Sequence, residues 1–243
     1  MDGPAWVGIG AQRCGTTWFT QMLIQHPDVC LRDGSDSFLL NKEMHYFDTS
    51  LIAGRPDIDA YRRAFVGCRA VGEFTPAYLR LPWVASLLKE SCSPSTPLIV
   101  LVRDPIERFW SALRWSTRPD GRADLFGDHE VIRLLESELV WGGMYADQLA
   151  VWERVFDGDR LIVIQYEAAV ADPATACRTV FDALGLPAIT PQELGASPTT
   201  TVAGDGDDRP AWVEDALRIA YKTMVERMTE RWGIDRALWP NFG

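Results

Sequence analysis

The sequence predicts an α/β fold of the P-loop type, with a central, mostly parallel sheet flanked by helices in a three-layer arrangement. Short apolar stretches of strand length alternate along the chain with stretches of helical periodicity, which is typical of such a sheet. Residues 98–102 are five consecutive apolar residues rich in β-branched types, as expected for a strand buried on both faces. A glycine-bounded loop between Gly10 and Gly15 follows the first apolar run.

In the first half of the chain, the pattern predicts strands at 5–9, 70–73 and 98–102 and helices at 16–25 and 106–115. The first helix is predicted because Trp18, Phe19, Met22 and Leu23 recur at helical spacing. Pro105 lies at the first turn of the second helix, where a fixed φ angle is favourable and the missing N–H costs nothing.

In the second half of the chain, the pattern predicts a buried strand at 161–165 and helices at 145–156, 173–184 and 211–232. Two segments, 116–128 and 186–210, are polar and rich in Gly, Pro or Asp, so we expect loops there. Loops of this length usually serve a site, and we expect both to border a binding pocket and to be more mobile than the sheet. No linker separates the elements, and residues 1–243 are predicted to form a single domain.

The charge balance limits what the protein can bind. Of 243 residues, 24 are Lys or Arg and 34 are Asp or Glu, which gives a formal net charge of −10. Nucleic acid and anionic lipid surfaces both require a positive field, so neither is an expected partner. Any anion that the protein binds must be held by basic residues concentrated in a local pocket.

The five cysteines and the N-terminus both favour a cytoplasmic protein. The cysteines are scattered without C-x-x-C spacing, which predicts reduced thiols and no structural zinc or other metal site. The first ten residues lack the basic and apolar regions of a signal peptide. No apolar run approaches the roughly 20 residues needed to span a bilayer, so we expect no membrane span.

The loop from Gly10 to Gly15 predicts a phosphate site. Backbone N–H groups of such a loop and the start of the following helix both favour an anion, and the G-x-x-x-x-G spacing is that of a P-loop. A nucleoside triphosphatase would continue with Lys and then Ser or Thr. Here Thr16 and Thr17 follow, and the cation lies inside the loop as Arg13. The loop can therefore hold a phosphate without the lysine that kinases need.

A second candidate segment follows the central strand. Arg103 stands where this strand ends, at the sheet edge where α/β proteins bind ligands, and Ser111 lies two helical turns further on. Two alternatives stay open at this stage. Arg103 can form a strand-end salt bridge with Asp104, and Arg108 can be a cation on the helix surface or pair with Asp104 or Glu107.

A third candidate segment, residues 41–48, contains a carboxylate and an imidazole close together. Glu43 or His45, if placed near the phosphate loop, can accept a proton from an attacking hydroxyl. Taken alone, the same two residues are equally compatible with an ordinary surface position.

Together with two further segments, these stretches match one known family in order along the chain. The segments are Gly10-Ala-Gln-Arg-Cys-Gly-Thr-Thr17, Lys42-Glu-Met-His-Tyr-Phe-Asp48, Glu73-Phe-Thr-Pro-Ala-Tyr78, Val102-Arg-Asp-Pro-Ile-Glu-Arg-Phe-Trp-Ser111 and Gly143-Met-Tyr-Ala-Asp-Gln-Leu149. They resemble the sulfotransferases that use 3′-phosphoadenosine 5′-phosphosulfate (PAPS). The closest resemblance is to the branch that holds the heparan sulfate sulfotransferases and related bacterial enzymes.

The resemblance implies that PAPS is the co-substrate and PAP the product, with no metal required, because cationic side chains and backbone donors stabilise the charge instead. Glu43 would then be the base that acts on an acceptor hydroxyl or amine, assisted by His45. Arg13 would neutralise charge on the leaving phosphate and the sulfuryl oxygens. The residues implied in nucleotide binding are Gln12, Arg13, Cys14, Gly15, Thr16, Thr17 and Trp18 for the 5′-phosphosulfate, Arg103 and Ser111 for the 3′-phosphate, and Arg209 in the late loop.

The sequence departs from this branch at three places. The loop cation, usually Lys, is Arg13, and the lysine of the branch's E-K-T-P-A-Y segment is replaced by Phe74. The late loop, which usually carries K-G-R-x-H-P beside a disulfide, keeps Arg209 and Pro210 but has no cysteine.

The acceptor is predicted to be a small molecule or a carbohydrate, either free or bound to a carrier protein. Four aspartates in and after the late loop disfavour a polyanionic glycan: Asp205, Asp207, Asp208 and Asp215. Four tryptophans favour a neutral or apolar acceptor, unless they belong to the core: Trp110, Trp115, Trp141 and Trp152.

Two other functions remain as alternatives. One is a P-loop nucleotide kinase or ATPase with Asp104 as its Mg²⁺ ligand, which the absence of Lys after Gly15 disfavours. The other is a non-catalytic nucleotide-binding protein of the same fold, which the loss of the cation at position 74 favours.

Overall fold

The sheet at the centre of the protein has five strands in the order β2-β3-β1-β4-β5, and every pair is parallel. This computed structural model describes residues 3–32, 37–49, 56–116, 137–156, 158–190, 194–195 and 209–243. The strands are β1 (Trp6–Gly10), β2 (Val29–Leu31), β3 (Ala70–Phe74), β4 (Leu98–Val102) and β5 (Leu161–Gln165). The predicted α/β fold with a parallel central sheet is thus confirmed.

The three inner strands form the core of the molecule. Every residue of β1, β3 and β4 is buried, because helices cover both faces of the sheet. The pairing aligns Val7 with Glu73 on one side and with Leu98 on the other, and Leu98 in turn with Leu161. The carboxyl ends of β1, β3 and β4 therefore meet at one edge of the sheet, which is where the loops with the candidate site residues begin.

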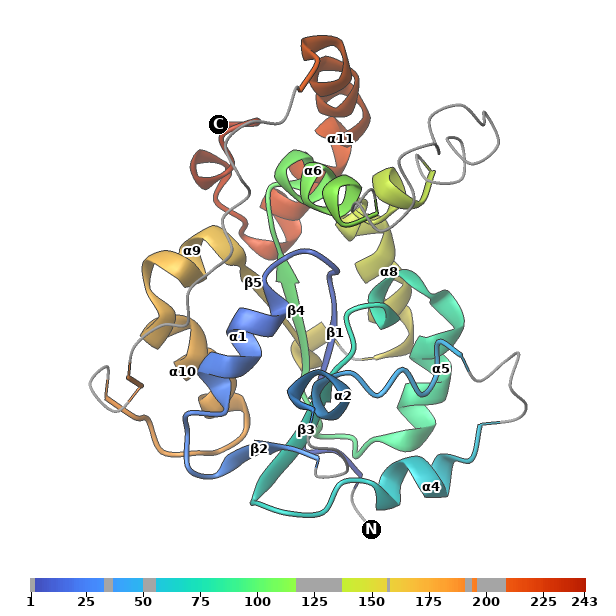
Figure 1. Cartoon of the computed structure of the whole chain (residues 1–243), viewed down its shortest axis with the longest axis vertical. Helices are drawn as coiled ribbons and strands as arrows, with labels where there is room; N and C mark the ends of the chain where they lie inside the picture. The colour runs from blue at the N-terminus through green and yellow to red at the C-terminus, as the bar shows by residue number, and fades with distance from the viewer. Residues whose placement is uncertain are drawn as a thin grey trace.

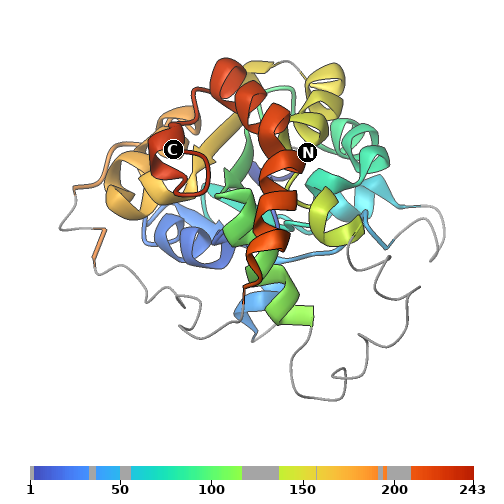
Figure 2. The ribbon, with the colours of Figure 1, turned by 90° about the horizontal axis from the view of Figure 1, so that it is seen from above.

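Helices surround the sheet on both faces (Figure 1). On one face lie α1 (Thr16–Leu23), α9 (Tyr166–Ala171) and α10 (Pro173–Ala183), and on the other lie α4 (Ile58–Arg63), α5 (Pro82–Ser91) and α8 (Tyr145–Val155). Beyond the carboxyl ends of the strands, α11 (Ala211–Trp232) crosses over α6 (Pro105–Ser116), as Figure 2 shows from above. The short α2 (Phe38–Lys42) precedes the candidate base segment. The described ranges also contain three 3₁₀ turns: Tyr78–Arg80, Gly158–Arg160 and Arg236–Leu238.

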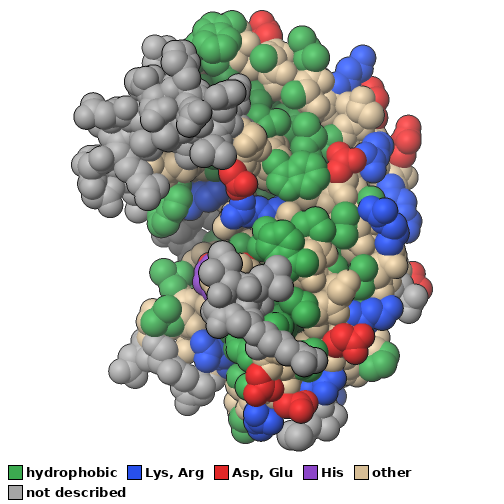
Figure 3. Space-filling model, turned by 90° about the vertical axis from the view of Figure 1, so that its right-hand side faces the viewer, with side chains coloured by type: hydrophobic (Ala, Val, Ile, Leu, Met, Phe, Trp, Pro, Cys, Tyr) green, Lys and Arg blue, Asp and Glu red, His purple; other side chains and the backbone are tan. Residues whose placement is uncertain are grey.

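The surface formed over α4, α5 and α8 mixes acidic, basic and hydrophobic side chains (Figure 3). Among the described residues, no helix is both long enough and apolar enough to cross a bilayer. Much of the two segments predicted as mobile loops lies outside the described residues, namely 117–128, 191–193 and 196–208.

The expectation that all cysteines are reduced is wrong for two of them. Cys30 on β2 and Cys68, just before β3, form a disulfide with a Cα–Cα distance of 6.1 Å. The pairing of β2 with β3 aligns Cys30 with Val71 and so brings together two residues that are 38 positions apart in sequence. Cys14, Cys92 and Cys177 carry free thiols. The cysteines therefore no longer support a cytoplasmic location, which stays a prediction.

We expect the variant Cys30→Ser/Cys68→Ser to lose about 2–4 kcal/mol of unfolding free energy, because the bond closes a loop of 38 residues in the unfolded chain. Urea denaturation of the oxidised protein and of the double variant measures this loss. Cys92→Ser is the matched control, since Cys92 carries a free thiol. If the double variant is as stable as the wild type, the disulfide does not stabilise the fold.

Candidate active site

The loop between β1 and α1 is shaped to receive an anion. We call residues 11–15 the phosphate loop. Gly15 has a φ of 80°, and a Cβ atom there would lie 2.3 Å from a ring carbon of Tyr166, so two independent constraints require glycine. No described side chain caps α1, and the bond from Phe19 N to Gly15 O is the first of the helix. The amides of residues 16–18 thus precede the intrahelical bonds and can donate to an anion.

The predicted ligands Arg13 and Ser111 lie together at the phosphate loop. Arg13 adopts the left-handed region with a φ of 68°, and its exposed side chain reaches α6. There its Nε donates to Ser111 Oγ at 3.3 Å, and its guanidinium lies 4.9 Å from the ring centroid of Trp115. The fold therefore joins a cation of the loop to a hydroxyl of α6 that is 98 residues away in sequence.

The other two predicted cations meet at Glu107, which the sequence analysis treated only as a partner for Arg108. Arg209 makes two hydrogen bonds with the Glu107 carboxylate, at 2.6 and 3.1 Å, and Arg103 lies 3.9 Å from the same carboxylate. The guanidinium of Arg209 holds the pKa of Glu107 below its usual value, against the effect of burial. Two guanidinium groups thus share the Glu107 carboxylate, and Arg209 also lies 3.9 Å from the carboxylate of Glu214.

Both alternatives considered for this segment are wrong. Arg108 is 3% exposed rather than a surface cation, and it donates to the backbone oxygens of Gln12 and Leu139. Arg108 therefore binds the backbone of the phosphate loop instead of pairing with an acidic side chain. Asp104 is fully buried and accepts hydrogen bonds from Ile106 N and from both nitrogens of Asn241, so it does not pair with Arg103. The carboxylate that would bind Mg²⁺ in the kinase alternative is therefore buried inside the protein.

Two predicted nucleotide ligands have side chains that face the core. The thiol of Cys14 is fully buried 3.4 Å from the hydroxyl of Tyr145, and burial raises its pKa. Trp18 is 5% exposed and packs edge-on against Tyr166. Trp18 can therefore offer a ligand its backbone amide rather than its side chain, whereas the amide of Cys14 donates to Ala11 O at 3.3 Å.

The segment of residues 43–48, which we call the base loop, contains a chain of three charged groups. His45 Nε2 lies 3.2 Å from Glu43 Oε2, and its Nδ1 lies 2.6 Å from Asp48 Oδ2. Hydrogen bonds to Asp48 and to Glu43 raise the pKa of His45 to about 10, so the imidazole is protonated at neutral pH. His45 can therefore donate a hydrogen bond to Glu43 but cannot accept a proton there.

Glu43 is held as a carboxylate by two cationic neighbours. Burial alone would raise its pKa, but hydrogen bonds from His45 and Lys42 outweigh burial and lower the pKa below its usual value. Its side chain keeps 26% of its surface exposed. The group is thus ionised at neutral pH and accessible to a substrate.

Lys42 is a further candidate site residue, for which the sequence motif alone predicts no function. Its side chain is fully buried, and its Nζ donates to Glu43 Oε1 at 2.6 Å and to Thr16 Oγ1 at 3.3 Å. The ammonium group also lies 5.3 Å from the ring centroid of Phe74. The only signal for it in the sequence was its position next to Glu43.

The buried carboxylate of Glu73 links the end of β3 to the base loop. Its Oε1 accepts hydrogen bonds from the hydroxyls of Tyr61 and Tyr78, at 2.7 and 3.2 Å. Its Oε2 accepts from Thr75 Oγ1 at 2.6 Å and from the amide of Met44 at 3.2 Å. Burial raises the pKa of Glu73, and these donors oppose that effect.

The same group of side chains holds the next two amides of the base loop. The amide of His45 donates to Thr75 Oγ1 at 3.3 Å, and the amide of Tyr46 donates to the Tyr78 hydroxyl at 3.0 Å. Three consecutive backbone N–H groups are therefore bound by the side chains of one segment, Glu73 to Tyr78. This arrangement sets where the side chains of Lys42 and Glu43 lie relative to α1.

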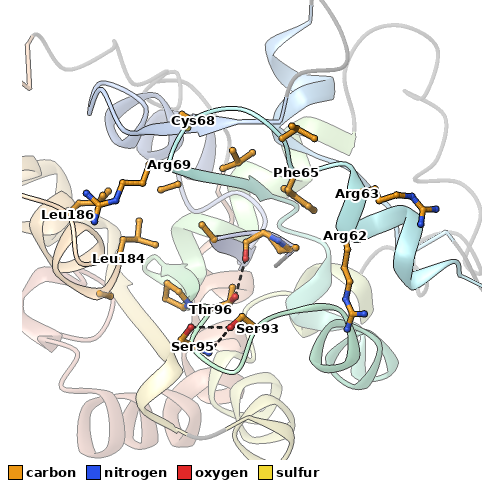
Figure 4. A pocket seen from close by; sticks show the side chains of 18 residues that line it. Arg62, Arg63, Phe65, Cys68, Arg69, Ser93, Ser95, Thr96, Leu184 and Leu186 are labelled. Atoms are coloured by element: carbon orange, nitrogen blue, oxygen red, sulfur yellow. Dashed lines mark hydrogen bonds between the residues drawn. The ribbon is translucent and has the colours of Figure 1, made fainter. Parts of the chain in front are cut away.

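A cavity of about 850 Å³ opens at the opposite edge of the sheet, near the amino ends of β1, β3 and β4 (Figure 4). Its polar side chains are used within the protein: Arg62 donates to Ser91 O, Arg69 to Gly185 O and Thr96 to Pro4 O. None of the candidate site residues lines it.

Residues 6–196 match the family model described as the sulfotransferase domain. The mouse heparan sulfate glucosamine 3-O-sulfotransferase 3B1 is 31% identical over 192 residues, which cover 75% of this chain and 46% of that protein. The chain thus spans about half the length of the curated relatives it matches.

Two solved structures are similar over nearly the whole chain. The crystal structure of a sulfotransferase from Alicyclobacillus acidocaldarius has a TM-score of 0.73 and 25% identity, covering 98% of this chain and 99% of that one. A mouse sulfotransferase complexed with PAP has a TM-score of 0.51 and 15% identity, covering 98% of this chain and 88% of that one, which is a likeness of fold. Since the family model covers the whole sheet and all of the described base and phosphate loops, the chain belongs to the sulfotransferase domain family.

Proposed function

We propose that this protein transfers a sulfuryl group from PAPS to a hydroxyl or amine of an acceptor and releases PAP. The observation that carries the proposal is that one side chain contacts both halves of the site, namely the start of α1 and the base loop. Lys42 Nζ binds Thr16, the first residue of the uncapped helix α1, and also Glu43, the candidate base. A donor anion at α1 and an acceptor at Glu43 would thus be neighbours.

The residues present fit a nucleotide with phosphate groups at both its 5′ and 3′ positions. The amides at the start of α1 and the Arg13 guanidinium would hold the 5′ end. Ser111, Arg103 and Arg209 would hold the 3′-phosphate, for which a guanidinium offers a planar pair of donors. In support, Arg103 and Arg209 lie together at the Glu107 carboxylate within a chain whose formal net charge is −10.

In the transfer, the acceptor oxygen or nitrogen forms a bond to the sulfur of PAPS. The bond between that sulfur and the bridging phosphate oxygen breaks, and its electron pair leaves on PAP. Glu43 accepts the proton that the acceptor loses. His45, protonated and held by Asp48, donates to Glu43 and keeps its carboxylate directed at the acceptor. Arg13 and the α1 amides stabilise the negative charge that develops on the leaving phosphate.

The acceptor in this proposal is a neutral or apolar small molecule or carbohydrate, free or carrier-bound. Of the four tryptophans considered, Trp110 and Trp152 are buried in the core, while Trp115 and Trp141 are 55% and 38% exposed. Trp115 lies against Arg13 and is therefore placed to contact an acceptor beside the donor. Of the four aspartates, only Asp215 is among the described residues, and it pairs with Arg218.

Ligand selectivity tests the proposed function against both alternatives. We expect PAP to raise the melting temperature without Mg²⁺, and ATP, with or without Mg²⁺, to raise it less at equal concentration. Thermal shift measurements with the three ligands decide this. A preference for Mg²⁺-ATP would favour a kinase, and PAP binding without any turnover of PAPS would favour a non-catalytic protein.

We expect Arg103→Ala to weaken PAP binding by about 2–5 kcal/mol, because a phosphate dianion loses a charged donor in a partly buried site. Isothermal titration calorimetry with PAP measures the change. Arg154→Ala is the matched control, since that arginine is exposed on α8 and donates to Ala150 O of the same helix. Wild-type affinity in Arg103→Ala would remove Arg103 from the nucleotide site.

We expect Glu43→Gln to lower kcat by about 10²–10⁴-fold while PAP affinity is retained, because the amide cannot accept the acceptor's proton. His45→Ala should cost less, since His45 acts through Glu43. PAP release at saturating PAPS, with an acceptor that supports wild-type turnover, measures both, and Glu153→Gln on α8 is the control. Turnover of Glu43→Gln within a few-fold of wild type would refute the assignment of the base.

A further inference from the structure

We propose that Lys42 is a catalytic residue whose ammonium group binds the non-bridging oxygens of the sulfuryl group during transfer. This inference rests on the proposed function and assigns the transferring group a cation besides Arg13. Lys42 ends α2, so it reaches the site from a different segment than the phosphate loop.

The first argument is where the ammonium group lies. In P-loop nucleotide enzymes, the residue after the second loop glycine is a lysine that reaches the terminal phosphates. Here that residue is Thr16, and its hydroxyl oxygen accepts a hydrogen bond from Lys42 Nζ at 3.3 Å. A cation therefore stands next to the position from which a P-loop lysine would act, although it comes from a residue 26 positions later.

The second argument is the position of the ammonium group relative to the base. Lys42 Nζ lies 2.6 Å from Glu43 Oε1, so it contacts both the start of α1 and the proton acceptor. In an in-line transfer the sulfuryl group lies between the leaving phosphate and the attacking atom. With the phosphate at α1 and the attacking atom at Glu43, the group would pass beside the ammonium.

The third argument is how the protein stabilises the buried ammonium group of Lys42. The side chain is fully buried, and burial holds the pKa of Lys42 below its usual value, although Glu43 and Glu73 act to raise the pKa. Burying an ammonium is costly unless it is paired, and the ion pair with Glu43 and the Phe74 ring offset this cost. Of its three N–H groups, two have hydrogen-bond acceptors among the described residues, which leaves one for a sulfuryl oxygen.

The test compares Lys42→Met, Lys42→Arg and the control Lys89→Met, which removes an exposed lysine on α5. Calorimetry measures the affinities for PAP and for PAPS, which differ by the sulfuryl group. PAP release from PAPS, with water as the acceptor, measures turnover without knowledge of the natural acceptor. Urea denaturation of each variant checks that it is folded.

We expect Lys42→Met to bind PAP within about threefold of wild type, to bind PAPS about tenfold more weakly, and to lose about 10²–10³-fold in turnover. Lys42→Arg keeps the charge and should recover part of both PAPS affinity and turnover, even if Lys42→Met is less stable. Lys89→Met should match the wild type.

Three results would overturn the inference. Lys42→Met that turns over PAPS within fivefold of wild type would show that the ammonium does not act on the transferring group. Equal weakening of PAP and PAPS would place Lys42 at the 5′-phosphate instead. If the wild type binds neither nucleotide, the proposed function itself is wrong and the inference falls with it, whereas the first two results leave that function intact.

Discussion

The hydrogen bonds of the buried Glu73 carboxylate hold the base loop against the sheet. Glu73 stands near the end of an inner strand, and it accepts from Tyr61, Tyr78, Thr75 and the amide of Met44. Its partners Thr75 and Tyr78 bind the next two amides of the base loop. Because a rigid parallel sheet carries this network, the base loop takes its position from the core rather than from its own short helix.

Charge in this protein is organised locally. The chain is acidic overall, yet its cations at the carboxyl edge of the sheet each have a specific partner: Lys42 with Glu43, Arg13 with Ser111, and Arg103 and Arg209 with Glu107. His45 lies between two carboxylates and stays protonated, which makes Glu43 the group able to accept a proton. A local cationic site can therefore bind an anion although the net charge would repel it.

Several candidate site residues could be proposed from the sequence because they lie in contiguous motifs. The phosphate loop, Glu43, His45 and the strand-end Arg103 all belong to segments in which residue type and spacing predict the site. Lys42 and Glu107 lie in the same segments, but their contacts could not be predicted. The direction of a side chain and the identity of its partner depend on residues that are distant in sequence. Arg108 was expected as a helix-surface cation or as a partner of Asp104 or Glu107. It is buried instead, because Gly142 and Leu139 pack against its guanidinium.

The sequence alone determined the α/β class and the long buried elements, since a strand covered on both faces must be apolar throughout. The bounds of β4, β5 and α11 follow their residue patterns directly. Only the tertiary structure decided the short elements and the pairings across the chain: the three-residue β2, the helices α2, α4, α5 and α9, the Cys30–Cys68 disulfide and the contacts of Lys42. A run of three to ten residues with mixed burial carries too weak a periodicity to specify its own conformation, and packing against the finished sheet stabilises it instead.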